Sequence, residues 1–239
     1  MRATVLLLIA GLAVRPAVAA APEGPEVDVA LVLVTDVSRS IDDSEFQLEK
    51  RGYQAAFTNP DVIAAIKDGP AGAIAVAYVE FASSFDVKTV VNWTVIRDDA
   101  SARAFAAHLV AAPRSFWGRT AIGAGLELAL DKLAASGVQA TRQVIDVCGD
   151  GTSNAGPPVE MMRDRAIAAG ITINGLAIIN EHPVAWTFAH VQPPGGLPGW
   201  YRAHVTGGPG SFVVEVHDFA SFGRAMTRKL ISEIASRLD

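Results

Sequence analysis

The sequence predicts an α/β fold: a doubly wound, mostly parallel six-stranded sheet with one antiparallel edge strand and helices on both faces. Apolar runs of strand length alternate along the chain with segments of helical periodicity. The first run, residues 29–34, is unbroken, which is typical of a strand buried on both faces of a parallel sheet. The chain has 239 residues, half of them hydrophobic, which is enough for one well-packed domain.

The N-terminus has the features of a secretory leader. An apolar run over residues 5–14 is too short to span a bilayer. Ala17-Val18-Ala19 fits the small-residue rule for cleavage, and cleavage after Ala21 is a close alternative. We therefore expect an exported protein, periplasmic or secreted, without a membrane span. The expected organisation is a signal peptide at residues 1–21, a linker at 22–26 and a domain at 27–239.

The first helix is expected over residues 43–58, where apolar side chains recur at helical spacing. Its charged residues are expected on the other faces; they are Glu45, Glu49, Lys50 and Arg51. Asn59-Pro60 ends this helix, and a short second helix is expected over residues 61–67.

The second strand is expected over residues 73–81, another nearly unbroken apolar run. Only Ala82-Ser83-Ser84 separates it from the next extended stretch, and a connection this short joins antiparallel neighbours. In that stretch Val91, Trp93 and Val95 alternate with polar residues, as in a half-exposed strand. This third strand is therefore expected to be the antiparallel edge.

The middle of the chain continues the alternation of helices and strands. The single cysteine, Cys148, ends an apolar run and is expected to be buried and inert. Pro157-Pro158 stands where proline is well tolerated, at the start of a helix. The expected elements are helices over residues 99–111, 120–137 and 157–169, and strands over 142–148 and 171–179.

Regularity fails over residues 180–210, which are rich in glycine and proline. A connection this long is a candidate functional loop, and Trp186, Trp200 and Tyr201 are expected to pack it or to anchor a partner. A short strand is expected over residues 211–216. A terminal helix then begins at Phe222, with basic residues on its outer side.

Polar oxygens follow the buried strands at the places where open α/β sheets bind ligands. Asp36, Ser38 and Ser40 come directly after the first strand, Thr120 stands just before a helix, and Asp150 follows the fourth strand. By this topology the two carboxylates and three hydroxyls converge at one edge of the sheet. Mg²⁺ prefers oxygen ligands, and neutral hydroxyls leave it able to attract an outside anion. The alternative for this first polar loop is simple helix capping.

These segments resemble the von Willebrand factor A-domain (vWA) family, in which they form the metal-ion-dependent adhesion site (MIDAS). The resemblance implies a vWA/Rossmann-like fold over about residues 27–239. It also implies direct metal ligation by Ser38 and Ser40, ligation by Thr120 when a partner is bound, and water-mediated roles for Asp36 and Asp150. The motifs that carry the resemblance are Asp36-x-Ser38-x-Ser40, Thr120 within Gly118-Arg119-Thr120-Ala121-Ile122-Gly123-Ala124-Gly125-Leu126, and Asp150 within Cys148-Gly149-Asp150-Gly151.

The chain looks most like a bacterial, exported, single-domain group within this superfamily. The resemblance implies a non-enzymatic, metal-dependent protein-binding module, with Mg²⁺ or alternatively Mn²⁺ in the site and an unknown protein partner that offers a carboxylate. Residues 180–210 depart from the common pattern, so the identity of the partner does not carry over.

An enzyme is the main alternative. A strand that ends in Asp36, followed later by Asp150 and Asn154, is also similar to a Mg²⁺-dependent haloacid-dehalogenase-type phosphatase with an aspartate nucleophile. Against it, Ser38 replaces the usual second aspartate, Asn154 stands where a carboxylate is typical, and Thr120 has no role there. The formal net charge of -5, without a lysine or arginine cluster, argues against a nucleic-acid partner.

Overall fold

The computed structural model describes residues 24–179 and 193–235. The expected signal peptide and Trp186 lie outside these ranges. Within the described ranges, no helix has the length and apolar character needed to cross a membrane.

Six strands form one sheet in the order β3-β2-β1-β4-β5-β6. All neighbouring pairs are parallel except β2 and β3, so the prediction of a single antiparallel edge strand is confirmed. β1 starts one residue before the expected domain boundary and lies in the middle of the sheet. The strands are β1 (Glu26–Asp36), β2 (Ile74–Phe81), β3 (Val87–Ile96), β4 (Gln139–Gly149), β5 (Thr172–Ile178) and β6 (Val213–Val216).

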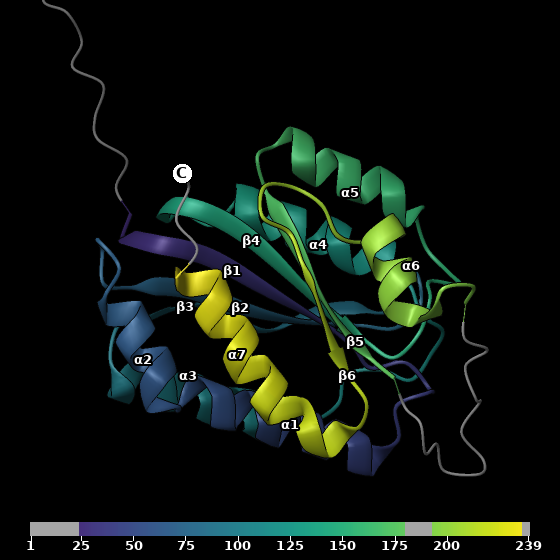
Figure 1. The fold of residues 1–239 in the computed structure, drawn as a ribbon, viewed down its shortest axis with the longest axis horizontal. Helices are drawn as coiled ribbons and strands as arrows, with labels where there is room; N and C mark the ends of the chain where they lie inside the picture. Colours follow the sequence, from purple (N-terminus) through teal and green to yellow (C-terminus); the bar gives the residue numbers. More distant parts are fainter. Residues whose placement is uncertain (1–23, 180–192, 236–239) are drawn as a thin grey trace, which may run out of the picture.

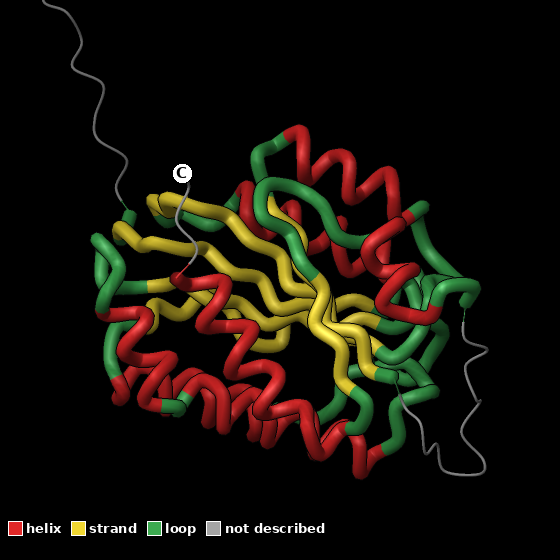
Figure 2. The backbone as a smooth tube through the Cα atoms, in the orientation of Figure 1, coloured by secondary structure: helices red, strands yellow, loops and turns green. Residues whose placement is uncertain are grey.

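Helices cover both faces of the sheet, as predicted (Figure 1). One layer consists of α1 (Asp43–Phe57), α2 (Pro60–Lys67), α3 (Asp99–Ala111) and α7 (Phe222–Ala235), which follows the 3₁₀ turn η1 (Phe219–Ser221). The other consists of α4 (Ile122–Ala134), α5 (Val159–Ala168) and α6 (Gly196–His204). The loops at the carboxyl ends of the parallel strands gather at one end of the molecule (Figure 2).

The core lies on both sides of β1. Leu31 and Leu33 pack into the cluster under α1, α2, α3 and α7, whereas Val32 and Val34 pack into the cluster under α4, α5 and α6. Successive side chains of a strand point to opposite faces, so an unbroken apolar run serves both layers. Each fully buried aliphatic side chain contributes about 1.5–3 kcal/mol to the stability of the fold.

The prediction that the charged residues of the first helix avoid the core is wrong for Glu49 and Lys50, which are each 1% exposed, and for Glu45, which is 7% exposed. The Lys50 ammonium donates hydrogen bonds to the carbonyl oxygens of Leu109 (2.5 Å) and Ala112 (3.0 Å) at the end of α3. It also lies 3.7 Å from the Glu80 carboxylate on β2. The last carbonyls of a helix have no partner within it, so α3 offers acceptors that make this burial tolerable.

The prediction of outward-facing basic residues on the last helix holds for Arg228, which is exposed, and is wrong for Lys229, which is fully buried. Lys229 pairs with Asp146 of β4 at 2.6 Å and with Glu233 one turn further along α7. The Asn174 amide donates a 2.8 Å hydrogen bond to Glu233. The lysine therefore joins α7 to the centre of the sheet.

The prediction that residues 180–210 are irregular throughout is wrong, because α6 lies within this segment. Gly195 precedes α6 with a φ of 83°, a left-handed conformation that glycine adopts readily. Pro198 is tolerated because it falls in the first turn, where backbone N–H groups have no partner within the helix. Leu197 and Tyr201, one turn apart, are buried and fix the helix on the sheet.

Candidate metal centre

The five residues singled out in the sequence lie together at the carboxyl edge of the sheet. The hydroxyl oxygens of Ser38 and Ser40 are 3.1 Å apart, and Thr120 Oγ1 donates to Ser38 Oγ at 3.2 Å. Ser40 Oγ donates to Asp150 Oδ1 at 2.7 Å. Asp36, at the end of β1, accepts a 2.7 Å hydrogen bond from the Ser38 amide. Each of the five is buried, from 0% exposed for Asp36 to 7% for Ser40.

Helix capping does not explain Ser40. The N-cap of α1 is Asp42, whose Oδ1 accepts from the Glu45 amide at 2.9 Å, while Glu45 Oε2 accepts from the Asp42 amide at 2.8 Å. This reciprocal pair satisfies the helix start. The hydroxyl of Ser40 is directed instead to Asp150, 110 positions away in the chain.

Asn154 fixes the position of Thr120. Its side-chain oxygen accepts from the Thr120 backbone amide at 3.0 Å, and its backbone N–H donates to the Thr120 carbonyl at 2.8 Å. The pair joins the loop after β4 to the loop before α4. Asn154 therefore has a structural role here, through one side-chain acceptor and one backbone donor.

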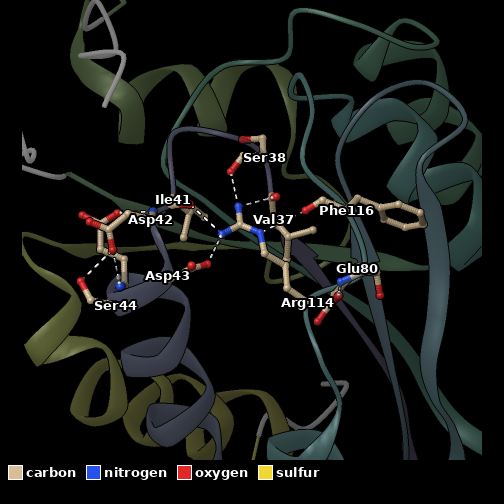
Figure 3. Close-up of polar contacts among 11 residues, drawn as sticks. Val37, Ser38, Ile41, Asp42, Asp43, Ser44, Glu80, Arg114 and Phe116 are labelled. Carbon is tan, nitrogen blue, oxygen red and sulfur yellow. Dashed lines mark hydrogen bonds and ion pairs between the residues drawn. The ribbon is translucent and has the colours of Figure 1, made fainter. Parts of the chain in front are cut away.

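Arg114 holds the loop that carries the serines (Figure 3). Its guanidinium donates to the carbonyl oxygens of Val37 (2.7 Å), Ser38 (2.6 Å) and Ile41 (2.8 Å), and its Nε donates to Phe116 (3.0 Å). The side chain is only 6% exposed. Arginine suits this position because its planar head offers five donors, whereas lysine offers a single point charge.

The segment that carries Arg114 is itself held against β2. The Ser115 amide donates a 2.9 Å hydrogen bond to Glu80 Oε2, and Glu80 also faces the Lys50 ammonium. The indole of Trp117 stacks on the Arg114 guanidinium at 3.7 Å. A chain of polar contacts therefore runs from the sheet through this segment to the serine loop.

A buried carboxyl lies beneath the site. Burial raises the pKa of Glu49 to about 8, and the carboxylates of Asp36, Glu80 and Asp150 act in the same direction. The Cys148 thiol donates a 3.1 Å hydrogen bond to Glu49 Oε1, which opposes this rise. Cys148 is buried, so the prediction of a buried thiol is confirmed. Burial raises the pKa of this thiol, which disfavours its reactive thiolate form.

The donor set fits a hard cation. Two carboxylates and three hydroxyls offer only oxygen, the ligand type that Mg²⁺ and Mn²⁺ accept. The described part of the chain contains no group of three or more histidine, cysteine, aspartate or glutamate side chains that could hold a metal ion.

Sequence reasoning missed three residues around the centre: Arg114, Asn154 and Glu49. Arg114 lies in a loop, and no local pattern reveals which carbonyls it reaches. In the sequence, Asn154 stands out only as a departure from a phosphatase motif. Glu49 lies on a helix that carries both an exposed acidic residue, Asp43, and a buried one, Glu45, so its burial depends on the tertiary structure.

Comparison with known proteins identifies the family. A family model described as "Protein of unknown function (DUF1194)" matches residues 26–238. The chain belongs to the DUF1194 family. Among curated proteins, none is a significant match.

Solved structures show that this DUF1194 chain has a vWA-like fold. Proximal thread matrix protein 1 (PTMP1) from the mussel byssus, with a zinc-occupied MIDAS motif, superposes with a TM-score of 0.64 at 17% identity, over 89% of this chain and 49% of that chain. BatB from Bacteroides thetaiotaomicron superposes with a TM-score of 0.53 at 21% identity, over 87% of this chain and 98% of BatB. The vWF domain of the pilus tip protein Mfa5 from Porphyromonas gingivalis superposes with a TM-score of 0.58 at 11% identity, over 89% of this chain and 98% of that domain. The chain thus spans about half the length of PTMP1.

Proposed function

We propose that this protein is an exported, non-enzymatic binding module that holds one divalent cation, Mg²⁺ or Mn²⁺, and uses it to bind a carboxylate of a protein partner. The metal residues are Asp36, Ser38, Ser40, Thr120 and Asp150. Ser38 and Ser40 ligate directly, Thr120 joins when the partner arrives, and the two aspartates act mainly through water. The bound cation supplies a Lewis-acidic position for the partner's carboxylate.

One observation carries this proposal: the Ser40 hydroxyl contacts Asp150 while Asp42 caps the neighbouring helix. The buried hydroxyls therefore serve the site rather than the start of α1. A protein that only needed a stable loop would gain little from collecting three buried hydroxyls and two carboxylates, since like charges repel and buried polar groups cost free energy.

The surroundings of the site favour an acidic partner. Arg39 and Arg119 are both exposed and immediately adjoin the proposed ligands in sequence. Their loops touch, because the Arg39 amide donates a 3.0 Å hydrogen bond to the Gly118 carbonyl. Two cations beside the metal would attract a carboxylate even though the whole chain carries a formal net charge of -5.

An exposed aromatic lies near the same edge. Phe85, in the turn between β2 and β3, is 96% exposed. The same turn is joined to the Thr120 loop, because Ser83 Oγ accepts a 3.1 Å hydrogen bond from the Arg119 amide. Aromatic side chains are frequent anchors of interfaces, so the partner is expected to offer an apolar group next to its carboxylate.

Export and the absence of enzymatic activity are part of the same proposal. Similarity to extracellular and pilus proteins, PTMP1 and Mfa5 among them, supports export. The haloacid-dehalogenase-type alternative loses support because Asn154 is engaged in holding Thr120.

Mass spectrometry of the native mature protein should find a terminus between residues 20 and 22. Phosphatase turnover that disappears in Asp36→Asn would instead favour the enzyme.

A pull-down with the mature protein tests the binding function. Bait should retain its partner in Mg²⁺ and release it in EDTA, and Arg39→Ala with Arg119→Ala should weaken retention. Asp131→Ala, an exposed acidic change on α4, serves as the control for loss of charge. Equal retention in Mg²⁺ and EDTA by wild type would contradict metal-dependent binding.

A further inference from the structure

Tyr201 extends from α6 across the sheet to the candidate metal centre. Its ring covers Gly175 of β5, where a Cβ atom would lie 2.8 Å from the tyrosine Cδ1. Its hydroxyl lies over Gly149 of β4, where a Cβ atom would lie 2.9 Å from the hydroxyl oxygen and 3.2 Å from Asp36 Oδ2. Two glycines therefore make room for this side chain, and the hydroxyl and the Asp36 carboxylate border the same small space.

The Tyr201 hydroxyl is fully buried, yet no described residue forms a hydrogen bond with it. A buried hydroxyl without a partner is destabilising, because it loses its hydrogen bonds to water and gains none in the protein. The contrast with Tyr53 is informative, because the hydroxyl of that buried tyrosine forms a 2.8 Å hydrogen bond with Thr35. Phenylalanine at position 201 would fill the same space without this cost, so packing alone does not explain the hydroxyl.

The position of the Tyr201 hydroxyl indicates which group it could bind. This hydroxyl lies beside Asp36, one of the five proposed metal residues. A phenol is protonated at neutral pH and can donate a hydrogen bond to a carboxylate. Donors of this kind, one step removed from the metal, hold ligating groups in orientation and typically change metal affinity by about 10–100-fold when they are lost.

We propose that Tyr201 is a positioning residue of the metal centre: with a cation bound, its hydroxyl donates a hydrogen bond to the Asp36 carboxylate, directly or through one water molecule. This inference rests on the proposed function. The proposed hydrogen bond gives the Tyr201 hydroxyl a partner in the metal-bound state. It also makes α6 a part of the site, although α6 lies in the segment that departs from the common vWA pattern.

Tyr201→Phe tests the proposal because it removes one oxygen atom and keeps the ring. Mn²⁺ is the probe, and its Kd is measured by calorimetry on the mature protein. We expect the Kd to rise about tenfold or more. The unfolding temperature in EDTA should stay the same or increase, since the variant no longer buries an unpaired hydroxyl. A residue with only a structural role would not combine these two effects.

Tyr53→Phe is the matched control, because its hydroxyl has a protein partner. It should lower the unfolding temperature in EDTA and leave the Mn²⁺ Kd within about twofold. An unchanged Kd in Tyr201→Phe, with wild type binding Mn²⁺, would overturn the inference and leave the proposed function intact. Absence of Mn²⁺ binding by wild type would overturn both.

Discussion

The guanidinium of Arg114 donates a 2.6 Å hydrogen bond to the carbonyl oxygen of Ser38, 76 positions earlier in the chain. The same head group binds two further carbonyls of that loop (Figure 3). These bonds turn the carbonyls of Val37, Ser38 and Ile41 toward the arginine, and the hydroxyls of Ser38 and Ser40 lie 3.1 Å from each other. The geometry of the candidate metal centre therefore depends on a residue that is not itself a candidate ligand.

Arg114→Lys should lower the free energy of unfolding by about 2–4 kcal/mol, because several hydrogen bonds to a charged donor are lost. It should also weaken Mn²⁺ binding about tenfold, since the serine loop loses its support. Urea denaturation in EDTA and Mn²⁺ titration measure the two effects. Arg97→Lys, an exposed change before α3, is the control. A variant equal to wild type in both assays would show that the loop holds its own shape.

Glu49→Gln should change stability in a pH-dependent way. Burial raises the pKa of Glu49 to about 8 from its ordinary 4.5. Between these two values the unfolded chain has released the proton and the folded protein keeps it, so the folded state binds more protons and stability falls as the pH rises. The loss is at most about 1.4 kcal/mol per pH unit. The glutamine variant does not share this loss.

Urea denaturation at pH 5 and pH 8, both in EDTA, measures this effect. At each pH the free energy of unfolding of wild type is subtracted from that of Glu49→Gln. This difference should be a few kcal/mol more positive at pH 8 than at pH 5. The same difference from wild type at both pH values would mean that Glu49 titrates normally in the folded protein.

Lys229→Ala should be strongly destabilising, whereas Arg228→Ala should not. Lys229 is fully buried between Asp146 and Glu233, and its removal leaves two carboxylates facing each other without a cation. Breaking a buried ion pair in this way costs about 3–5 kcal/mol. The exposed neighbour should change stability by less than about 0.5 kcal/mol. Equal, small effects in denaturant unfolding would mean that the carboxylates take up protons at little cost.

Thr120→Ala should separate metal binding from partner binding. If Thr120 joins the metal only when the partner arrives, the variant should bind Mn²⁺ within about threefold of wild type and lose most of its Mg²⁺-dependent partner retention. Calorimetry and the pull-down report the two steps. A large loss of Mn²⁺ affinity in Thr120→Ala would place this hydroxyl on the metal from the start.

The sheet and the five candidate ligands could be predicted because their signals are local. An unbroken apolar run ends just before Thr35 and Asp36. The connection after residue 81 is too short for a parallel crossover, so β3 must run antiparallel to β2. The order of strands then brings the loops after β1 and β4 together with the loop before α4. Each of these inferences needs only neighbouring residues and one rule of topology.

The supporting residues could not be predicted because their roles arise between distant segments. Lys50 is buried since the end of α3 offers it carbonyl groups, and Lys229 is buried since β4 offers it a carboxylate. Arg114 meets a loop that is remote in sequence. Tyr201 lies in a glycine- and proline-rich stretch whose helix forms through burial of its apolar face rather than through propensity.

Thermal unfolding in Mg²⁺ and in EDTA is the most direct test of the metal centre. A cation that binds only the folded state at a hundredfold excess over its Kd stabilises it by about 2.7 kcal/mol. For a domain of this size that is a shift on the order of 5–10 °C. We predict this shift in wild type and in Asp131→Ala, a much smaller shift in Asp36→Ala and Asp150→Ala, and an intermediate one in Ser40→Ala. Identical unfolding temperatures with and without Mg²⁺ in wild type and in both site variants would contradict the account.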